Sequence, residues 1–183
     1  MEIRYRRKEG RLRDFELEVE YPASPARVCQ MLTDPQFLEF RWRQISQVKC
    51  EVQVEQAGSE TFVSRAKVDL AELKTPATYA RLLPDQLEIE VVENWLSSPC
   101  PDRIAHGDFE VRFGKVPVQV KAKSLLEASP QEAEKTLRKI SGTLQVNMPL
   151  IGGKVERELL SHLQIFSGGE EAAARLWLAN NAG

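Results

Sequence analysis

Histidine and cysteine are scarce in this chain. Of its 183 residues, two are histidine and three are cysteine. Two histidines argue against a multi-histidine metal site. The cysteines, Cys29, Cys50 and Cys100, lie far apart, form no C-x-x-C pair and are odd in number, so they predict no disulfide framework. We therefore expect a reduced protein with no metal site and no cofactor.

Long apolar runs and a large net charge are absent as well. No apolar stretch approaches the roughly 20 residues needed to span a bilayer. The basic N-terminal sequence MEIRYRRKEGRLRD is not followed by the apolar segment of a secretory signal. The formal net charge of −2 argues against nucleic-acid binding through the overall charge of the molecule. We predict a cytoplasmic protein with a single sizeable core.

The motifs of common enzyme active sites are also missing, since the chain has no G-x-S-x-G and no H-E-x-x-H. The segment MPLIGGKVERELL, 148–160, resembles a phosphate-binding loop. However, Met148 stands where that motif begins with glycine, and Val155 stands where it carries a metal-binding hydroxyl. We therefore expect no nucleotide site. Gly152 and Gly153 are predicted to shape the path into the terminal helix, with Gly152 facing the sheet and Gly153 the opposite side.

The chain is rich in alternating strand patterns. FELEVEY, 15–21, alternates apolar and acidic residues, which predicts a half-buried strand. Ser24-Pro25 and Asp34-Pro35 predict the starts of two short helices. Strand patterns then continue to Met148, broken by a short helical segment predicted at 76–85, and a helix is predicted over 150–180. This order predicts an α+β fold, with a curved antiparallel sheet of about seven strands around a long C-terminal helix.

Several segments resemble one known superfamily. SPARVCQMLTDPQF, directly after the first strand, resembles the opening of START-like (SRPBCC) helix-grip proteins, which include polyketide cyclases and lipid-transfer domains. ENW at 93–95, VPVQV at 116–120, VNMPLIGGKVE at 146–156 and RLWL at 175–178 are similar to a bacterial domain of unknown function within that superfamily. The resemblance spans residues 14–180 and implies a helix-grip fold. It implies no particular chemistry, because the superfamily has many activities.

The space between a curved sheet and the helix it holds is the natural small-molecule site of such an architecture. The first hypothesis is therefore a non-enzymatic protein that binds an apolar or amphipathic small molecule, such as a lipid or a polyketide-like compound. For the aromatic candidates, plain core packing is the alternative. The predicted lining residues are Trp42, Phe62, Glu93, Trp95, Phe109, Val155, Leu159, His162 and Phe166.

Two of these candidates are ionisable. Glu93 shares the apolar face of the strand at 87–96, so either that face turns to solvent or Glu93 has a buried partner, with His162, Arg112 and Lys121 as candidates. On a helical wheel, His162 falls on the apolar stripe of the terminal helix. It is either a core residue with satisfied hydrogen bonds or a ligand contact. The second hypothesis is a cyclase- or hydratase-like enzyme with Glu93 and His162 as acid–base groups, although no catalytic residue is assigned and binding is favoured over catalysis.

Residues 1–13 are predicted to form a basic arm outside a domain that covers residues 14–183. The arm holds six arginines and lysines against two glutamates. One interpretation is a solvated tail, and another is peripheral contact with an anionic lipid or contact with nucleic acid. A third hypothesis for the protein, which this arm suggests, is a protein-interaction module. The sequence predicts no specific nucleic-acid site and does not indicate an oligomeric state.

Overall fold

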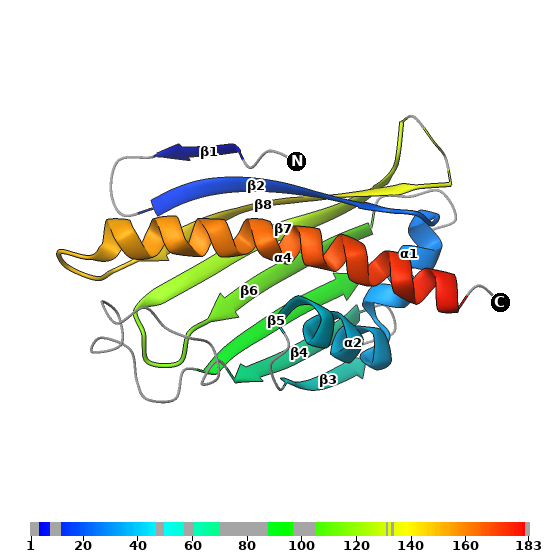
Figure 1. Ribbon diagram of the computed structural model, residues 1–183, viewed down its shortest axis with the longest axis horizontal. Helices are drawn as coiled ribbons and strands as arrows, with labels where there is room; N and C mark the ends of the chain where they lie inside the picture. The colour runs from blue at the N-terminus through cyan, green and yellow to red at the C-terminus, as the bar shows by residue number, and fades with distance from the viewer. Residues whose placement is uncertain are drawn as a thin grey trace.

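The computed structural model describes residues 4–7, 12–46, 50–56, 61–69, 88–96, 105–130, 132 and 134–181. The predicted helical segment at 76–85 and Cys100 lie outside these residues. The predicted architecture is confirmed, because a curved antiparallel sheet holds a long C-terminal helix and two short helices follow the first long strand (Figure 1). The strands are β1 (Arg4–Arg7), β2 (Leu12–Tyr21), β3 (Cys50–Gln56), β4 (Thr61–Asp69), β5 (Glu88–Leu96), β6 (Ala105–Arg112), β7 (Val118–Ala128) and β8 (Thr136–Val146).

The sheet order is β1-β2-β8-β7-β6-β5-β4-β3, so that the described residues form eight strands where about seven were predicted. The additional strand is β1, which pairs antiparallel with β2 from Arg4 opposite Glu16 to Arg7 opposite Arg13. Strand β2 begins at Leu12, so part of the basic segment that was predicted as an arm belongs to the sheet. A strand of four residues gives too short an alternation to stand out among basic residues.

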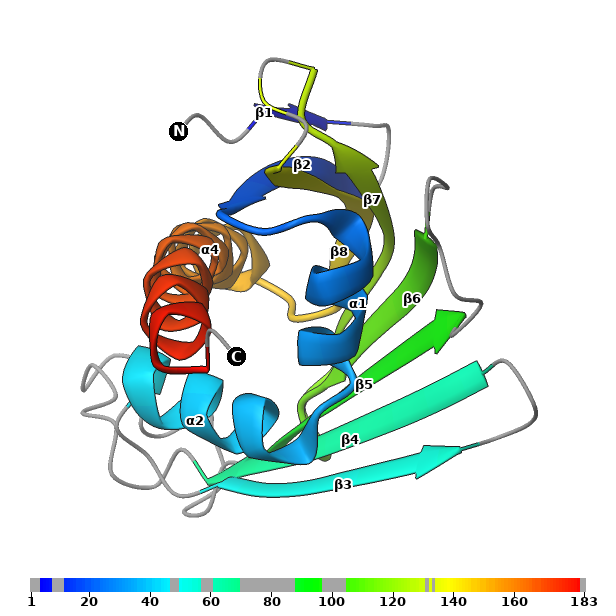
Figure 2. The same cartoon turned by 90° about the vertical axis from the view of Figure 1, so that its right-hand side faces the viewer.

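The two short helices begin as predicted. Helix α1 (Pro25–Leu32) has Ser24 at its N-cap and a proline in its first turn, although the serine side chain makes no capping hydrogen bond. Helix α2 (Pro35–Ser46) also begins at a proline, and its Asp34 carboxylate accepts a hydrogen bond from the Gln36 amide at 2.8 Å. These helices and the long helix α4 (Gly152–Asn180) lie on the inner side of the curved sheet (Figure 2).

The inner face of the sheet carries the core. Its apolar members alternate along each strand, as the 15–21 pattern predicted, and Phe15, Leu17, Val19 and Tyr21 are all buried. Gly142 on β8 lies where a Cβ would come 2.4 Å from the carbonyl oxygen of the neighbouring β7 strand. A side chain at this position therefore does not fit without a backbone shift.

The buried face of α4 is rotated from the predicted one. The predicted stripe contained Val155, Leu159, His162 and Phe166, yet His162 is exposed and the other three are half-buried. The centre of the buried face instead follows the series Glu156, Leu160, Ser167, Glu170 and Ala174. The predicted stripe did not include these two glutamates, and a glutamate is rarely buried unless it is paired. Here both are paired, Glu156 with Arg13 at 2.7 Å and Glu170 with Arg138 at 2.6 Å.

In the turn from β8 into α4, the residue with a strained backbone conformation is a leucine. Gly152 faces the end of β8, as predicted, but a Cβ there would make only ordinary contacts at 3.6 Å, and Gly153 faces open space. The left-handed backbone conformation belongs to Leu150, with φ of 66°. The Ile151 amide donates to the Pro149 carbonyl at 2.8 Å and closes a three-residue turn around Leu150. This is a γ-turn with a left-handed centre, the rarer and more strained of the two γ-turn types.

Candidate functional site

Four charged side chains meet in the interior, between the sheet and the helices α2 and α4. They are Arg41 on α2, Glu93 on β5, Arg138 on β8 and Glu170 on α4, and we call them the buried quartet. The exposed fraction of each is 1% or less. Charged residues are almost never fully buried unless they are paired, and buried, mutually perturbed charges gather at functional sites. The quartet is therefore the candidate site.

Glu93 is held by two arginines and an indole. Arg41 Nη2 donates to Glu93 Oε1 at 2.7 Å, and Arg138 Nη2 donates to Oε2 at 3.2 Å. Trp95 Nε1 donates to the same Oε2 at 3.2 Å. Burial alone would raise the pKa of Glu93, but the charges of Arg41 and Arg138 outweigh burial and hold this pKa below its ordinary value of 4.5. Glu93 is therefore ionised at neutral pH.

Glu170 is held from the other side of the quartet. Arg138 Nη1 donates to Glu170 Oε1 at 2.6 Å, and the Tyr21 hydroxyl donates to the same oxygen. Burial, and then the adjacent Glu170 carboxylate, raise the pKa of Tyr21 well above its ordinary value of 10.0, so its hydroxyl stays protonated. Arg138 also donates to Ser124 Oγ at 3.0 Å and lies 5.0 Å from the ring centroid of Trp95. The Arg138 guanidinium is thus enclosed by partners.

Some of the hydrogen-bond donors of Arg41 are not used. Its Nε and Nη1, and the Oε2 of Glu170, have no hydrogen-bond partner among the described residues. Nη1 and Oε2 lie 3.6 Å apart, which is an ion pair but is too long for a hydrogen bond. The Arg41 guanidinium is 5.7 Å from the ring centroids of both Trp42 and Phe166. Unused donors and an unused acceptor therefore lie side by side, next to two aromatic rings.

The quartet is electrically balanced, with two guanidinium groups and two carboxylates. Removing an ion from water costs several kcal/mol, and well-packed apolar residues in place of a buried ion pair are often as stabilising or more so. Stability alone therefore does not account for four charges in this interior. The arrangement keeps polar, hydrogen-bonding groups in a fixed place inside the fold.

The structure answers the question that Glu93 raised. Its face does not turn to solvent, and its partners are Arg41 and Arg138 rather than the three predicted candidates. His162 is 59% exposed at its side chain and lies 3.8 Å from Glu158, one turn away on the same helix surface. The predicted acid–base pair of Glu93 and His162 is therefore wrong, because one residue is enclosed by arginines and the other faces solvent.

The other predicted lining residues lie in or beside the core. Trp42, Trp95 and Phe109 are buried, at 5%, 3% and 8% exposure, and Phe62 is half-buried. Phe166 packs on Trp42 with ring centroids 5.4 Å apart. Val155, Leu159 and Phe166 pack against the main core cluster. The candidates nearest the quartet are Trp95, which binds Glu93, and the Trp42–Phe166 pair beside Arg41.

Tyr21 was not predicted as a polar contact, and three quartet members, Arg41, Arg138 and Glu170, were not predicted as site residues at all. Arg138 has the same parity as the buried Ile140, Leu144 and Val146 of β8, which marks it as inward-facing. Arg41 follows the buried Phe37 and Leu38 of α2 at helical spacing. At Arg138 and Arg41, a cation on an otherwise apolar face could therefore have indicated a buried charge from the sequence.

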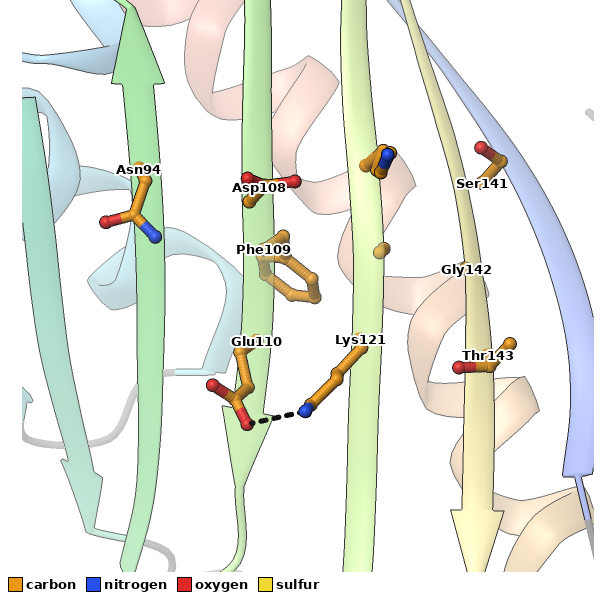
Figure 3. Close-up of a pocket in the computed structure, with 10 residues that line it drawn as sticks. Asn94, Asp108, Phe109, Glu110, Lys121, Ser141, Gly142 and Thr143 are labelled. Carbon is orange, nitrogen blue, oxygen red and sulfur yellow. Dashed lines mark ion pairs between the residues drawn. The ribbon is translucent and has the colours of Figure 1, made fainter. Parts of the chain in front are cut away.

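Two hollows lie on the outer face of the sheet. The larger, about 470 Å³, is bordered by Asp108, Lys121, Ser141 and their neighbours, and the smaller has about 340 Å³. Lys121 Nζ lies 3.9 Å from Glu110 Oε1 across the larger one, with helix α4 on the far side of the sheet (Figure 3). The smaller hollow reaches Trp95 and Ser124, which contact the quartet. Because the exposed Asp108 and Lys123 border both hollows, neither is the predicted apolar site between the sheet and α4.

Comparison with known proteins agrees with this architecture. A family profile described as a protein of unknown function, DUF2505, matches residues 16–178. The chain belongs to the DUF2505 family. No curated protein sequence matches it significantly. The predicted resemblance to a domain family of unknown function is thus confirmed.

Solved structures share the fold of this DUF2505 protein at low sequence identity. A Thermus thermophilus protein has a TM-score of 0.58 and 18% identity, over 92% of this chain and 99% of that one. The Zhui aromatase/cyclase of a Streptomyces species has a TM-score of 0.57 and 14% identity, over 89% and 91%. The human StarD13 lipid transfer and protein localization domain has a TM-score of 0.53 and 15% identity, over 92% and 81%. These similarities establish the START-like helix-grip fold.

Among the described residues, none of the helices combines the length and the hydropathy that a membrane span requires. No group of three or more metal-binding side chains is found in those same segments.

Replacing Tyr21 with phenylalanine tests the polar side of the quartet. The substitution keeps the buried ring but removes the hydroxyl that donates to Glu170, so we expect the free energy of unfolding to fall by about 1.5–3 kcal/mol, the usual worth of a hydrogen bond to a charged group. Urea denaturation followed by circular dichroism measures this change. Ser141→Ala, on the exposed outer face, is the matched hydroxyl deletion and should have little effect. Equal stability of both variants would show that the Tyr21 hydroxyl does not support Glu170.

Proposed function

We propose that this DUF2505 protein binds an uncharged amphipathic small molecule between the sheet and helix α4. The polar group of the ligand accepts hydrogen bonds from Arg41 and donates one to Glu170, and its apolar body lies against Trp42 and Phe166. The observation that carries the proposal is the buried Arg41 guanidinium with unpartnered Nε and Nη1 among the described residues. Buried donors without partners are costly, and a ligand that satisfies them gains that free energy on binding.

The charge balance favours a neutral polar group. Two arginines already face two glutamates, so an anionic ligand would leave one buried negative charge unpaired. A hydroxyl group both accepts and donates, which matches the two unused N–H groups and the unused Glu170 Oε2. The fold supports the same class, because its solved neighbours include a domain named for lipid transfer and a protein named as an aromatase/cyclase.

Three naphthalene probes of similar size test this proposal. We expect 1-naphthol to bind at least about tenfold more tightly than 1-methylnaphthalene, because only the hydroxyl satisfies the unused hydrogen-bonding groups. We expect 1-naphthoate to bind more weakly than 1-naphthol, because it brings a negative charge beside Glu93 and Glu170. Quenching of tryptophan fluorescence and isothermal titration calorimetry measure the dissociation constants.

Arg41→Lys is the variant that assigns the binding to this site. Lysine keeps the positive charge but lacks the planar fork of donors, so the preference for 1-naphthol should disappear. Arg43→Lys, at a side chain that is 71% exposed on the same helix, is the matched control and should keep it. The proposal fails if wild-type protein binds neither neutral probe, if it binds both equally, or if the preference survives in Arg41→Lys. The wild-type comparison decides the question even where Arg41→Lys does not fold.

A further inference from the structure

The β8–α4 turn carries a fully exposed leucine in a strained backbone conformation. Leu150 has a relative exposure of 105% and φ of 66°. A left-handed conformation is unfavourable for leucine, and exposure of its whole side chain gains nothing from the core. Glycine at this position would remove the backbone strain, and a polar residue would avoid exposing an apolar side chain to water. Neither the fold nor the buried quartet requires a leucine here.

Leu150 belongs to an apolar tip, which we define as residues 113–117 and 147–151. The two segments lie together, because the Asn147 amide donates to the Pro117 carbonyl at 2.9 Å. Phe113, Val116 and Met148 of the tip are half-buried and pack against the core. They give Leu150 a fixed base from which it projects.

Positive charge surrounds the tip. Lys115, Lys154 and Arg157 are exposed, and neither lysine forms an ion pair with a described residue. The sequence has no acidic residue in 113–118 or in 147–155. The first glutamate beyond the tip, Glu156, is buried and paired with Arg13 at 2.7 Å. Residues 113–118 and 147–155 therefore offer exposed cations and no carboxylate, and the first exposed carboxylate along α4 is Glu158, one turn beyond Lys154.

The backbone of the turn satisfies part of its own hydrogen bonding. The Ile151 amide donates to the Pro149 carbonyl at 2.8 Å, and the Gly152 amide donates to the Met148 carbonyl at 2.9 Å. Pro149 has no N–H to satisfy. Fewer backbone groups therefore lose water when the turn leaves bulk solvent, which lowers the cost of entering a less polar medium.

We propose that this tip docks on an anionic membrane surface, with Leu150 inserted at the boundary of headgroups and acyl chains and with Lys115 and Lys154 on the lipid phosphates. An apolar side chain flanked by lysines matches the two layers of such a surface, an apolar interior and a negative outer region. The tip consists of other residues than the N-terminal segment 1–13, for which lipid contact was predicted. The proposal does not depend on the ligand proposed for the quartet.

Vesicle flotation tests the proposal with two vesicle compositions, phosphatidylcholine alone and phosphatidylcholine with about one third phosphatidylserine. We expect the wild-type protein to float with the anionic vesicles and much less with the neutral ones. Leu150→Gly should weaken binding to anionic vesicles by about tenfold, because the inserted side chain is lost. Lys154→Ala should weaken it by about fivefold, the usual effect of one basic residue near an anionic surface.

Leu150→Gly also separates binding from folding, because glycine accepts the left-handed conformation and the variant should melt no lower than wild type. Ile165→Ala is the matched control, since Ile165 is 60% exposed on α4 outside the tip and its loss should not change vesicle binding. The proposal is overturned if wild-type protein does not float with anionic vesicles or if Leu150→Gly floats equally well. The proposal would also be overturned if the wild-type protein formed a dimer and did not bind vesicles, and if Leu150→Gly made this dimer dissociate. The tip would then be a contact between copies of the chain.

Discussion

Replacing Arg138 with methionine is expected to lower the free energy of unfolding by about 3–5 kcal/mol at neutral pH. Arg138 bonds to both carboxylates of the quartet, to Glu170 at 2.6 Å and to Glu93 at 3.2 Å. Methionine fills much of the same space, so the main loss is electrostatic. Two carboxylates would then face Arg41 alone in an interior that solvent does not reach. Urea denaturation gives the free energy, and an unchanged m-value would show that the same surface is exposed on unfolding.

Arg112→Met is the matched control for this prediction. Arg112 also contacts two glutamates, Glu90 at 3.3 Å and Glu110 at 2.9 Å, but its side chain is 55% exposed. Water and salt screen such pairs, so this substitution should change stability very little. If the two substitutions had equal effects, Arg138 would not be neutralising two buried charges. Adding Glu170→Gln to Arg138→Met should restore part of the loss, because one unpaired charge is removed.

The quartet also connects parts of the chain that the sequence places far apart. It joins α2, β5, β8 and α4, so that charged hydrogen bonds connect helices α2 and α4 to the sheet. Hydrogen bonds have directions, and apolar contacts do not, so the quartet fixes how α2 and α4 sit on the sheet. The same contacts hold Arg41 where its unused donors lie beside Glu170 Oε2. Fixed polar groups of this kind are what a specific ligand site requires.

The sequence predicted the fold well because local signals determine most of it. The alternation in 15–21 was sufficient to predict strand β2. Ser24-Pro25 and Asp34-Pro35 were sufficient to predict where helices α1 and α2 begin. The resemblance to START-like proteins supplied the arrangement of these elements. Strand β1 was missed, because four mostly basic residues become a strand only by pairing with β2.

The site was harder to predict because it depends on partners rather than on patterns. Glu93 was recognised as an anomaly on an apolar face, but its arginines lie on α2 and β8, and nothing local links these elements to β5. The predicted stripe of α4 included the exposed His162 and did not include the buried Glu170. A helical wheel sorts residues by hydropathy and cannot see that a buried glutamate is neutralised by an arginine from a strand. Pairs of opposite charges on predicted apolar faces are therefore better site indicators than a single anomaly.

Glu93→Gln is expected to cost about 3–5 kcal/mol at neutral pH, and the cost should depend on pH in a defined way. Glutamine keeps the shape of the side chain but leaves the two guanidinium groups opposite a single carboxylate. Burial alone would raise the pKa of Glu93, yet Arg41 and Arg138 hold it below its ordinary value of 4.5. A carboxyl group whose pKa is lower in the folded state stabilises the protein above its unfolded-state pKa. That contribution is lost as the pH falls through the folded-state pKa.

The stability difference between wild type and Glu93→Gln should therefore be largest near neutral pH and should shrink as the pH falls below about 4.5. Urea denaturation at a series of pH values measures the difference directly. Glu55→Gln is the matched control, because Glu55 pairs with Arg65 at 2.9 Å on the outer face but is 61% exposed, and its difference curve should stay nearly flat. A Glu93→Gln difference that is small at neutral pH, or that grows in acid, would mean that Glu93 is not the ionised centre of the quartet. Arg41 would then lack its main partner, and the proposed ligand site beside it would lose its support.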